Sequence, residues 1–138
     1  MPEKYRDVAQ LTLGHFWISP DALPAERAHA FVGVSAASLY FYVYVRDSDI
    51  SSSATADNQK MWTLGDVAEF FIKPGGGRTD YWEIHITPND FLMDIYIPNR
   101  EKFTGGKIGW EDVVAPDSHT RKRVQVGEGY WALEACVP

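Results

Sequence analysis

The sequence has a single cysteine, Cys136, so no disulfide can form within the chain. Cysteine content therefore indicates neither an oxidising nor a reducing compartment. It has no apolar run long enough to cross a membrane. We expect no signal peptide in this chain, because its first residues lack the charged and apolar regions of one. Basic residues are in deficit: 13 Lys and Arg stand against 19 Asp and Glu, for a net charge of −6. Since nucleic acids and anionic membranes attract basic surfaces, we expect neither as a partner.

Internal repeats, low-complexity tracts and long amphipathic helix patterns are also missing from the 138 residues. The composition is that of a globular domain, with 45% hydrophobic and 14% aromatic residues. A chain of this length can bury a substantial core, so we predict one domain over residues 1–138. Many short apolar runs between close-set turn residues predict an all-β fold, an antiparallel β-sandwich.

Residues 61–98 show the clearest organisation. Apolar runs at residues 67–72, 81–86 and 91–97 are separated by the turn-forming sequences KPGGGRTD and TPND. We therefore predict three short antiparallel strands in a meander. Charged side chains interrupt these runs, and an unpaired carboxylate is strongly disfavoured in an apolar interior. One face of this sheet is therefore expected to be solvated, with Trp62 at its edge.

Further strands are predicted on both sides of the meander. Residues 39–47, LYFYVYVRD, alternate strictly between Leu, Phe and Val on one face and Tyr and Arg on the other. By composition and turn spacing, three more strands are expected at residues 30–34, 121–126 and 130–137, the last two paired as a hairpin around residues 127–129.

Two segments give weaker signals. Residues 1–29 are expected to be largely irregular, with one short strand and one helical turn beginning after Asp21 or Pro24. Residues 99–120 are expected to form a long loop with a short strand near residues 110–115.

The candidate binding residues of the meander are Trp62, Glu69, Glu83 and His85. An exposed indole can stack on the axial C–H groups of a pyranose, and carboxylates and imidazole can hydrogen-bond to vicinal hydroxyls. Glu83 and His85 share one strand face, because side chains two residues apart point the same way. Two ordinary alternatives stay open. In one, Trp62 only covers the edge of the core; in the other, the acidic groups form cross-strand ion pairs with Arg46 or Arg78.

Three other features of the sequence allow functional interpretations. The stripe of Tyr40, Tyr42 and Tyr44 could line a binding face, although such a stripe more often packs against the core. Paired carboxylates also suit glycoside hydrolysis, but no motif fixes the separation that this chemistry needs, so we do not expect an enzyme. Cys136 lies in a predicted strand and is expected to be an inert small hydrophobe.

A calcium site is one interpretation of the polar loop after the strand at residues 39–47. Asp47, Asp49 and Asp57 could supply hard oxygen ligands, with Asn58 beside them. The spacing fits no EF-hand loop, and Asx turns explain the same residues equally well.

Four segments together resemble the family 9 carbohydrate-binding modules and related DOMON-like domains, which are immunoglobulin-like β-sandwiches. The resemblance covers roughly residues 28–138. The segments are Leu39-Tyr40 running into Val45-Arg46-Asp47, Trp62 followed by Asp66 to Ile72, Tyr81 to Pro88, and Gly129-Tyr130-Trp131 with Glu134 and Pro138.

The resemblance implies a non-catalytic module that binds an oligosaccharide or polysaccharide chain end and assists polysaccharide degradation outside the cell or in the periplasm. It gives Trp62 the role of a stacking wall, and Asp47 and Glu69 that of hydroxyl acceptors. Glu83 stands where the family has an arginine. The family's second Trp wall follows the equivalent of Pro138, which implies either that this sequence is truncated at its C-terminus or that it lacks the family's last strands. Structural calcium is frequent in the family.

Two other functions remain open. Related sandwiches hold b-type haem through Met and His ligands, and the residue types are present in Met61, Met93, His15 and His85, although no spacing singles out a pair. Alternatively, the domain keeps the fold as a structural or interaction module without the sugar site.

Overall fold

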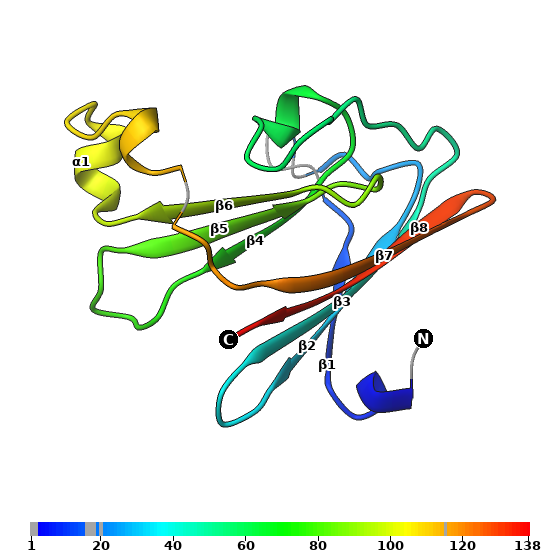
Figure 1. Ribbon diagram of the computed structural model, residues 1–138. Coiled ribbons are helices and arrows are strands. Elements are labelled where there is room, and N and C mark those ends of the chain that lie inside the picture. Colours follow the sequence, from blue (N-terminus) through cyan, green and yellow to red (C-terminus); the bar gives the residue numbers. More distant parts are fainter. Residues whose placement is uncertain (1–2, 16–18, 20, 115) are drawn as a thin grey trace. The chain divides into compact units, whose positions relative to one another are not determined.

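The protein was analysed as a computed structural model, which describes residues 3–15, 19, 21–114 and 116–138. The described residues form eight strands in two antiparallel sheets, with only short helical segments (Figure 1). The prediction of an all-β fold of the antiparallel β-sandwich class is confirmed. Contacts divide the chain into two compact units, one of residues 1–50 with 119–138 and one of residues 51–118. None of the helices among the described residues has the length and apolar character of a membrane span.

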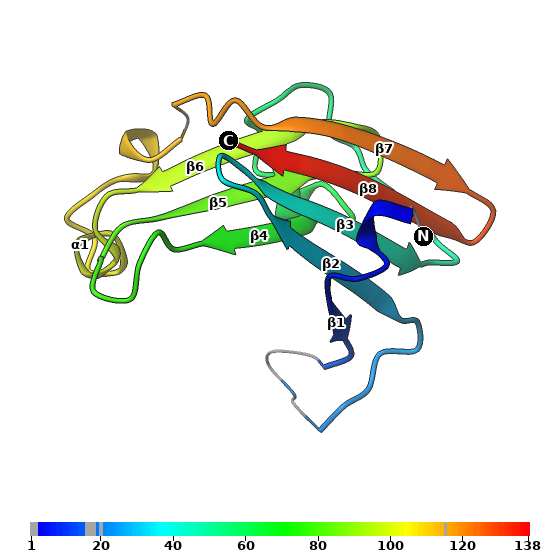
Figure 2. The ribbon, with the colours of Figure 1, turned by 90° about the horizontal axis from the view of Figure 1, so that it is seen from below.

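The first unit is a five-stranded sheet in the order β1-β2-β3-β8-β7 (Figure 2). Its strands are β1 (Ala9–Leu13), β2 (Ala28–Val34), β3 (Leu39–Arg46), β7 (Arg121–Gly127) and β8 (Tyr130–Val137), preceded by the 3₁₀ helix η1 (Glu3–Tyr5). The predicted strands are all present, within two residues of the expected bounds.

The alternation in β3 determines how this sheet packs. Val43 is buried and pairs with the buried Leu133 of β8. The tyrosines of the other face are half-buried, and Tyr42 packs against Tyr5, with ring centroids 5.5 Å apart. The hydroxyl of Tyr5 donates to the carbonyl of Phe41 at 3.2 Å. The tyrosine stripe therefore packs within the first unit, which is the commoner role of such a pattern.

The second unit contains the predicted meander, in the order β4-β5-β6. The strands are β4 (Ala68–Ile72), β5 (Tyr81–Ile86) and β6 (Leu92–Ile97). One face of β6 carries the core of the unit. This cluster consists of fully or nearly fully buried side chains, namely Ala54, Met61, Met93, Ile95, Ile97 and Val113.

The prediction of a helical turn after Asp21 or Pro24 was wrong, and so was that of a short strand near residues 110–114. Residues 21–27 contain no helix, and the helical segment of the N-terminal region is η1. The loop after β6 forms a short helix, α1 (Arg100–Thr104), and a 3₁₀ helix, η3 (Trp110–Asp112), instead of a strand. Only the isolated bridge from Val114 to Ile95 has β geometry there. α1 begins through local capping, because the side chain of Asn99 accepts from the backbone N–H of Lys102 at 2.9 Å.

The loop before β4 is closed by hydrogen bonds between its two ends. Ser51 N–H donates to Asp66 Oδ2 at 2.7 Å, and Asp66 N–H donates to Ser51 O at 2.8 Å. Ser53 N–H donates to Leu64 O at 2.8 Å. Gly65 makes this approach possible, because its φ of 130° is rare for residues with a side chain. The closure fixes the segment that carries Trp62.

Gly65→Ala is expected to destabilise the protein by about 2–3 kcal/mol, because the new Cβ would collide with the carbonyl of Ser51 in addition to the backbone strain. Urea unfolding measures the loss. Gly76→Ala is the matched control, since a Cβ there meets nothing within 4 Å. Equal stability of the two variants would contradict the described loop closure.

Candidate functional site

Trp62 lies in the 3₁₀ helix η2 (Met61–Thr63). The side chain of Met61 points into the core and is 0% exposed, whereas that of Trp62 is 42% exposed. The turn is held by a hydrogen bond from Leu64 N–H to Met61 O at 2.9 Å and by one from Thr63 Oγ1 to Lys60 O at 2.7 Å. An indole on a fixed turn loses little conformational freedom on binding a ligand.

His85 lies beside the indole. The two ring centroids are 5.4 Å apart with an interplanar angle of 61°, an edge-to-face contact. His85 is buried, with 2% of its side chain exposed, and each ring nitrogen faces a carboxylate. Nδ1 lies 3.4 Å from Glu69 Oε1, and Nε2 lies 3.4 Å from Glu83 Oε2. The sheet register explains this arrangement, because Glu69 of β4 pairs directly with His85 of β5.

The two carboxylates differ in exposure. The side chain of Glu69 is 32% exposed and that of Glu83 is 14% exposed. Burial and a hydrogen bond to Glu83 raise the pKa of Tyr81 to about 12, so its neutral hydroxyl donates to that carboxylate. His85 Nδ1 has no hydrogen bond of good geometry among the described residues. Glu69 is therefore the acceptor that remains open to a ligand.

The expectation of a solvated face is corrected by these exposures. Glu83 and His85 are largely withdrawn from water, and Asp94, on β6, is buried as well. Glu69 and Glu83 face the imidazole of His85, and the phenol of Tyr81 donates to Glu83. Asp94 lies on the other face of the sheet, where its Oδ2 accepts from Ser118 N–H at 2.9 Å. The open part of the meander is its β4 edge, where Glu69 and Phe71 are exposed.

Trp110 belongs to the same cluster and was not predicted as a site residue. Its ring centroid lies 5.1 Å from that of Trp62 at an interplanar angle of 79°. The ammonium of Lys60 lies over the Trp110 ring, 5.5 Å from its centroid. Apart from the aromatic residue itself, nothing in the sequence indicates this contact, because Trp110 comes from the loop after β6.

The remaining predicted ligands belong to both units. Asp47 lies in the first unit, and its Oδ1 accepts from Asp49 N–H at 2.9 Å, an Asx turn. Asp57 lies in the second unit, where its Oδ1 accepts from Leu92 N–H at 2.8 Å. Within the described ranges, no three His, Cys, Asp or Glu side chains are grouped to hold a metal ion. Calcium at Asp47, Asp49 and Asp57 stays a prediction, as does a sugar contact by Asp47.

The residues considered as haem ligands have other roles. Met61 and Met93 are fully buried within the same apolar cluster, and His85 lies between two carboxylates. His15 is in the first unit, at an exposed position. Nothing in this arrangement favours axial ligation by a Met and His pair.

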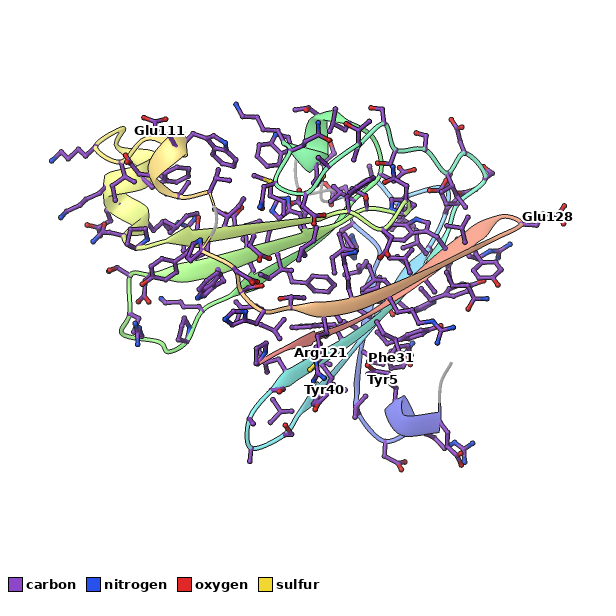
Figure 3. All side chains as sticks on the ribbon, viewed as in Figure 1. Tyr5, Phe31, Tyr40, Glu111, Arg121 and Glu128 are labelled. Atoms are coloured by element: carbon purple, nitrogen blue, oxygen red, sulfur yellow. The ribbon has the colours of Figure 1, made fainter. Side chains whose placement is uncertain are left out.

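Cys136 is less isolated than its sequence context indicated. It lines a pocket of about 230 Å³ in the first unit with Tyr5, Tyr40 and Arg121, whose side chains gather on this sheet (Figure 3). Burial raises the pKa of the Cys136 thiol, but hydrogen bonds with Arg121 and Ser38 outweigh it and lower the pKa. The distance from Arg121 Nη2 to Cys136 Sγ is 3.5 Å.

Arg78 was considered as a partner for the acidic residues of the meander, and it pairs with Asp80 instead. Arg78 Nε and Nη2 donate to the two oxygens of Asp80 at 2.7 and 2.6 Å. The hydroxyl of Tyr96 donates to Asp80 Oδ2 at 3.1 Å. The hydrogen bonds from Arg78 are the main reason that the pKa of Asp80 falls to about 2.

This pair predicts a pH dependence of stability. Because the folded pKa of Asp80 lies below the unfolded value of about 3.9, its contribution is present above about pH 4 and is lost as the pH falls toward about 2. Asp80→Asn should lower stability at pH 7 and flatten the loss between about pH 4 and 2. Burial raises the pKa of Asp94, so the contribution of Asp94 to stability decreases as the pH rises. This contribution is the same in the parent protein and in Asp80→Asn, so it cancels in their difference. Urea unfolding at several pH values measures the difference, and parallel curves for the two proteins would contradict the role of the pair.

Comparison with known proteins shows the fold but no family. No family model matches the chain, and no curated protein matches it. Among solved structures, the chain is similar to a protein from Bacteroides uniformis described as a "putative carbohydrate-binding protein", with a TM-score of 0.71 and 14% identity over 95% of this chain. The chain spans 60% of the length of that protein. The likeness confirms the fold.

Proposed function

We propose that this protein is a non-catalytic carbohydrate-binding module whose site is centred on Trp62. The observation that carries the proposal is a half-exposed indole, fixed on a turn, beside the exposed carboxylate of Glu69 and packed on the buried imidazole of His85. The indole stacks on the apolar face of a sugar ring, and Glu69 accepts hydrogen bonds from its hydroxyls. Glu83 and His85 hold Glu69 and Trp62 in place.

Two further observations support this function. The solved structure of similar fold is described as that of a putative carbohydrate-binding protein, and the sequence resembles the family 9 modules in four ordered segments. By the same resemblance we propose a polysaccharide chain end as the partner and an extracellular or periplasmic location. The protein would act there as an accessory to polysaccharide degradation.

A binding role suits the carboxylates better than catalysis. Hydrolysis by the usual mechanism needs two carboxyl groups that act on opposite sides of the glycosidic bond. Here Glu83 is engaged by both Tyr81 and His85, and Glu69 alone is open. A small and shallow site of this kind should bind with a dissociation constant between micromolar and millimolar, roughly −4 to −8 kcal/mol.

A glycan array followed by calorimetric titration tests the function. We expect saturable binding of at least one oligosaccharide class in this affinity range, with no release of reducing sugar. Titration with calcium and with EDTA measures whether calcium contributes. Absence of binding to every oligosaccharide at millimolar concentration would overturn the proposal.

A further inference from the structure

A pocket in the second unit opens beside the face of β4 and β5 that carries Glu69 and Glu83. It has a volume of about 360 Å³, within the range of small-ligand pockets. Phe71 and Tyr81 line it as a stacked pair, with centroids 6.4 Å apart and an interplanar angle of 23°. Phe71 is 63% exposed, although a large apolar side chain gains nothing from exposure in the free protein. The pair offers an apolar surface to a ring-shaped ligand.

The pocket and the Trp62 site are built on the same two strands, β4 and β5. Phe71 follows Glu69 by two residues on β4, so both side chains are on the same face, about 7 Å apart along the strand. Tyr81 precedes Glu83 by two residues on β5 and donates to its carboxylate. A short oligosaccharide that reaches Trp62 can therefore also reach this pocket.

Cationic groups line the pocket. Lys73, Arg78 and Arg100 contribute positive charge, and Asp80 and Glu101 contribute negative charge. The Arg78 and Asp80 charges neutralise each other in the bidentate pair. Among the residues that the structure describes, neither Lys73 nor Arg100 has a carboxylate within ion-pair distance. Lys73 Nζ donates to a single backbone carbonyl, that of Gly76, at 3.2 Å.

Arg100 is held at the pocket by the local fold. It is the first residue of α1, and its N–H donates to the carbonyl of Thr79 at 3.0 Å. Asn99, the N-cap residue of α1, reaches the hydroxyl of the same Thr79 at 3.4 Å. The backbone that carries the guanidinium is thereby tied to the residue that precedes Asp80 and Tyr81. The exposed guanidinium extends from this anchored backbone and can bind a carboxylate or a sulfate through two parallel hydrogen bonds.

We propose that the pocket of Phe71, Tyr81, Lys73 and Arg100 is a subsite for a negatively charged sugar, a uronic acid or a sulfated residue. This inference rests on the proposed carbohydrate-binding function and specifies its ligand class. The Phe71 and Tyr81 rings contact the sugar ring, while Arg100 and Lys73 bind the carboxylate or sulfate. The polysaccharide that the module recognises is therefore acidic.

The test compares oligosaccharides of equal length in three forms: neutral galacto-oligosaccharide, oligogalacturonate and sulfated galacto-oligosaccharide. We expect at least one acidic form to bind about tenfold more tightly than the neutral form at low salt, with the preference reduced at 0.5 M NaCl. The two acidic forms distinguish carboxylate from sulfate. The double variant Lys73→Gln with Arg100→Gln should remove the preference, and the control Lys107→Gln, an exposed cation outside the pocket, should keep it. Melting temperatures verify that each variant is folded.

The outcomes separate this inference from the proposed function. Equal binding of all three forms, or an acidic preference that survives the double variant, overturns the subsite and leaves the Trp62 function standing. Binding of acidic sugars that requires Arg100 but persists in Trp62→Ala supports the subsite and overturns the Trp62 function. If none of the three forms binds and the array is also negative, both fail.

Discussion

Trp62→Ala is expected to weaken glycan binding by more than tenfold while it leaves the protein folded. The indole is the largest exposed surface of the site, and truncation of a central aromatic anchor typically costs about 2 kcal/mol or more of binding free energy. The stability cost should be smaller, about 1–2 kcal/mol, because Trp62 is itself 42% exposed and loses mainly its edge contacts with the His85 and Trp110 rings. Calorimetric titration and thermal unfolding of the same samples measure the two effects.

Trp62→Phe is the matched control for this variant. A phenyl ring keeps a stacking face on the same turn, so binding should be reduced less than in Trp62→Ala. Unchanged affinity in Trp62→Ala would show that the indole only covers the edge of the core, which is the ordinary alternative for this residue.

Met61→Ala, at the adjacent position, is expected to destabilise the protein strongly and to change glycan binding little. Met61 is fully buried in the apolar cluster of the second unit, and removal of such a side chain leaves a cavity that costs about 2–5 kcal/mol. Binding by the fraction that remains folded should change only a few-fold, since the side chain has no exposed surface. Urea unfolding gives the free energy, and titration well below the melting temperature gives the affinity.

Met61→Leu preserves the volume and should cost less than about 1.5 kcal/mol. A Met61→Ala protein as stable as the parent would contradict the inward placement of this residue. Such a result would also contradict the outward placement of Trp62 on the same turn.

The strands could be predicted because their signals are local. The strict alternation of residues 39–46 and the Gly- and Pro-rich separators of the meander each determine an element without help from distant residues. The helix α1 escaped prediction because it spans only five residues. It depends on the cap at Asn99 and on the distant carbonyl of Thr79, and a periodic pattern cannot develop over so short a length.

The sequence predicted which residues form most of the candidate site, but not how deeply they are buried. Side-chain alternation was enough to place Glu83 and His85 on one face, and the register brings Glu69 to them. The burial of Glu83 and His85 could not be read from the sequence, because it arises from their mutual pairing and from the rings of Trp62 and Tyr81. Trp110 was missed for the same reason: it reaches Trp62 only through the tertiary fold.

The most direct test of the central claim follows the indole N–H signals of the five tryptophans by ¹⁵N–¹H NMR during titration with the tightest-binding glycan of the array. The Trp62 signal, assigned from its absence in Trp62→Phe, should shift saturably with the calorimetric dissociation constant. The signal of Trp131, which is buried in the first unit, should not move. A glycan that binds with saturable shifts elsewhere while the Trp62 signal stays in place would contradict the account.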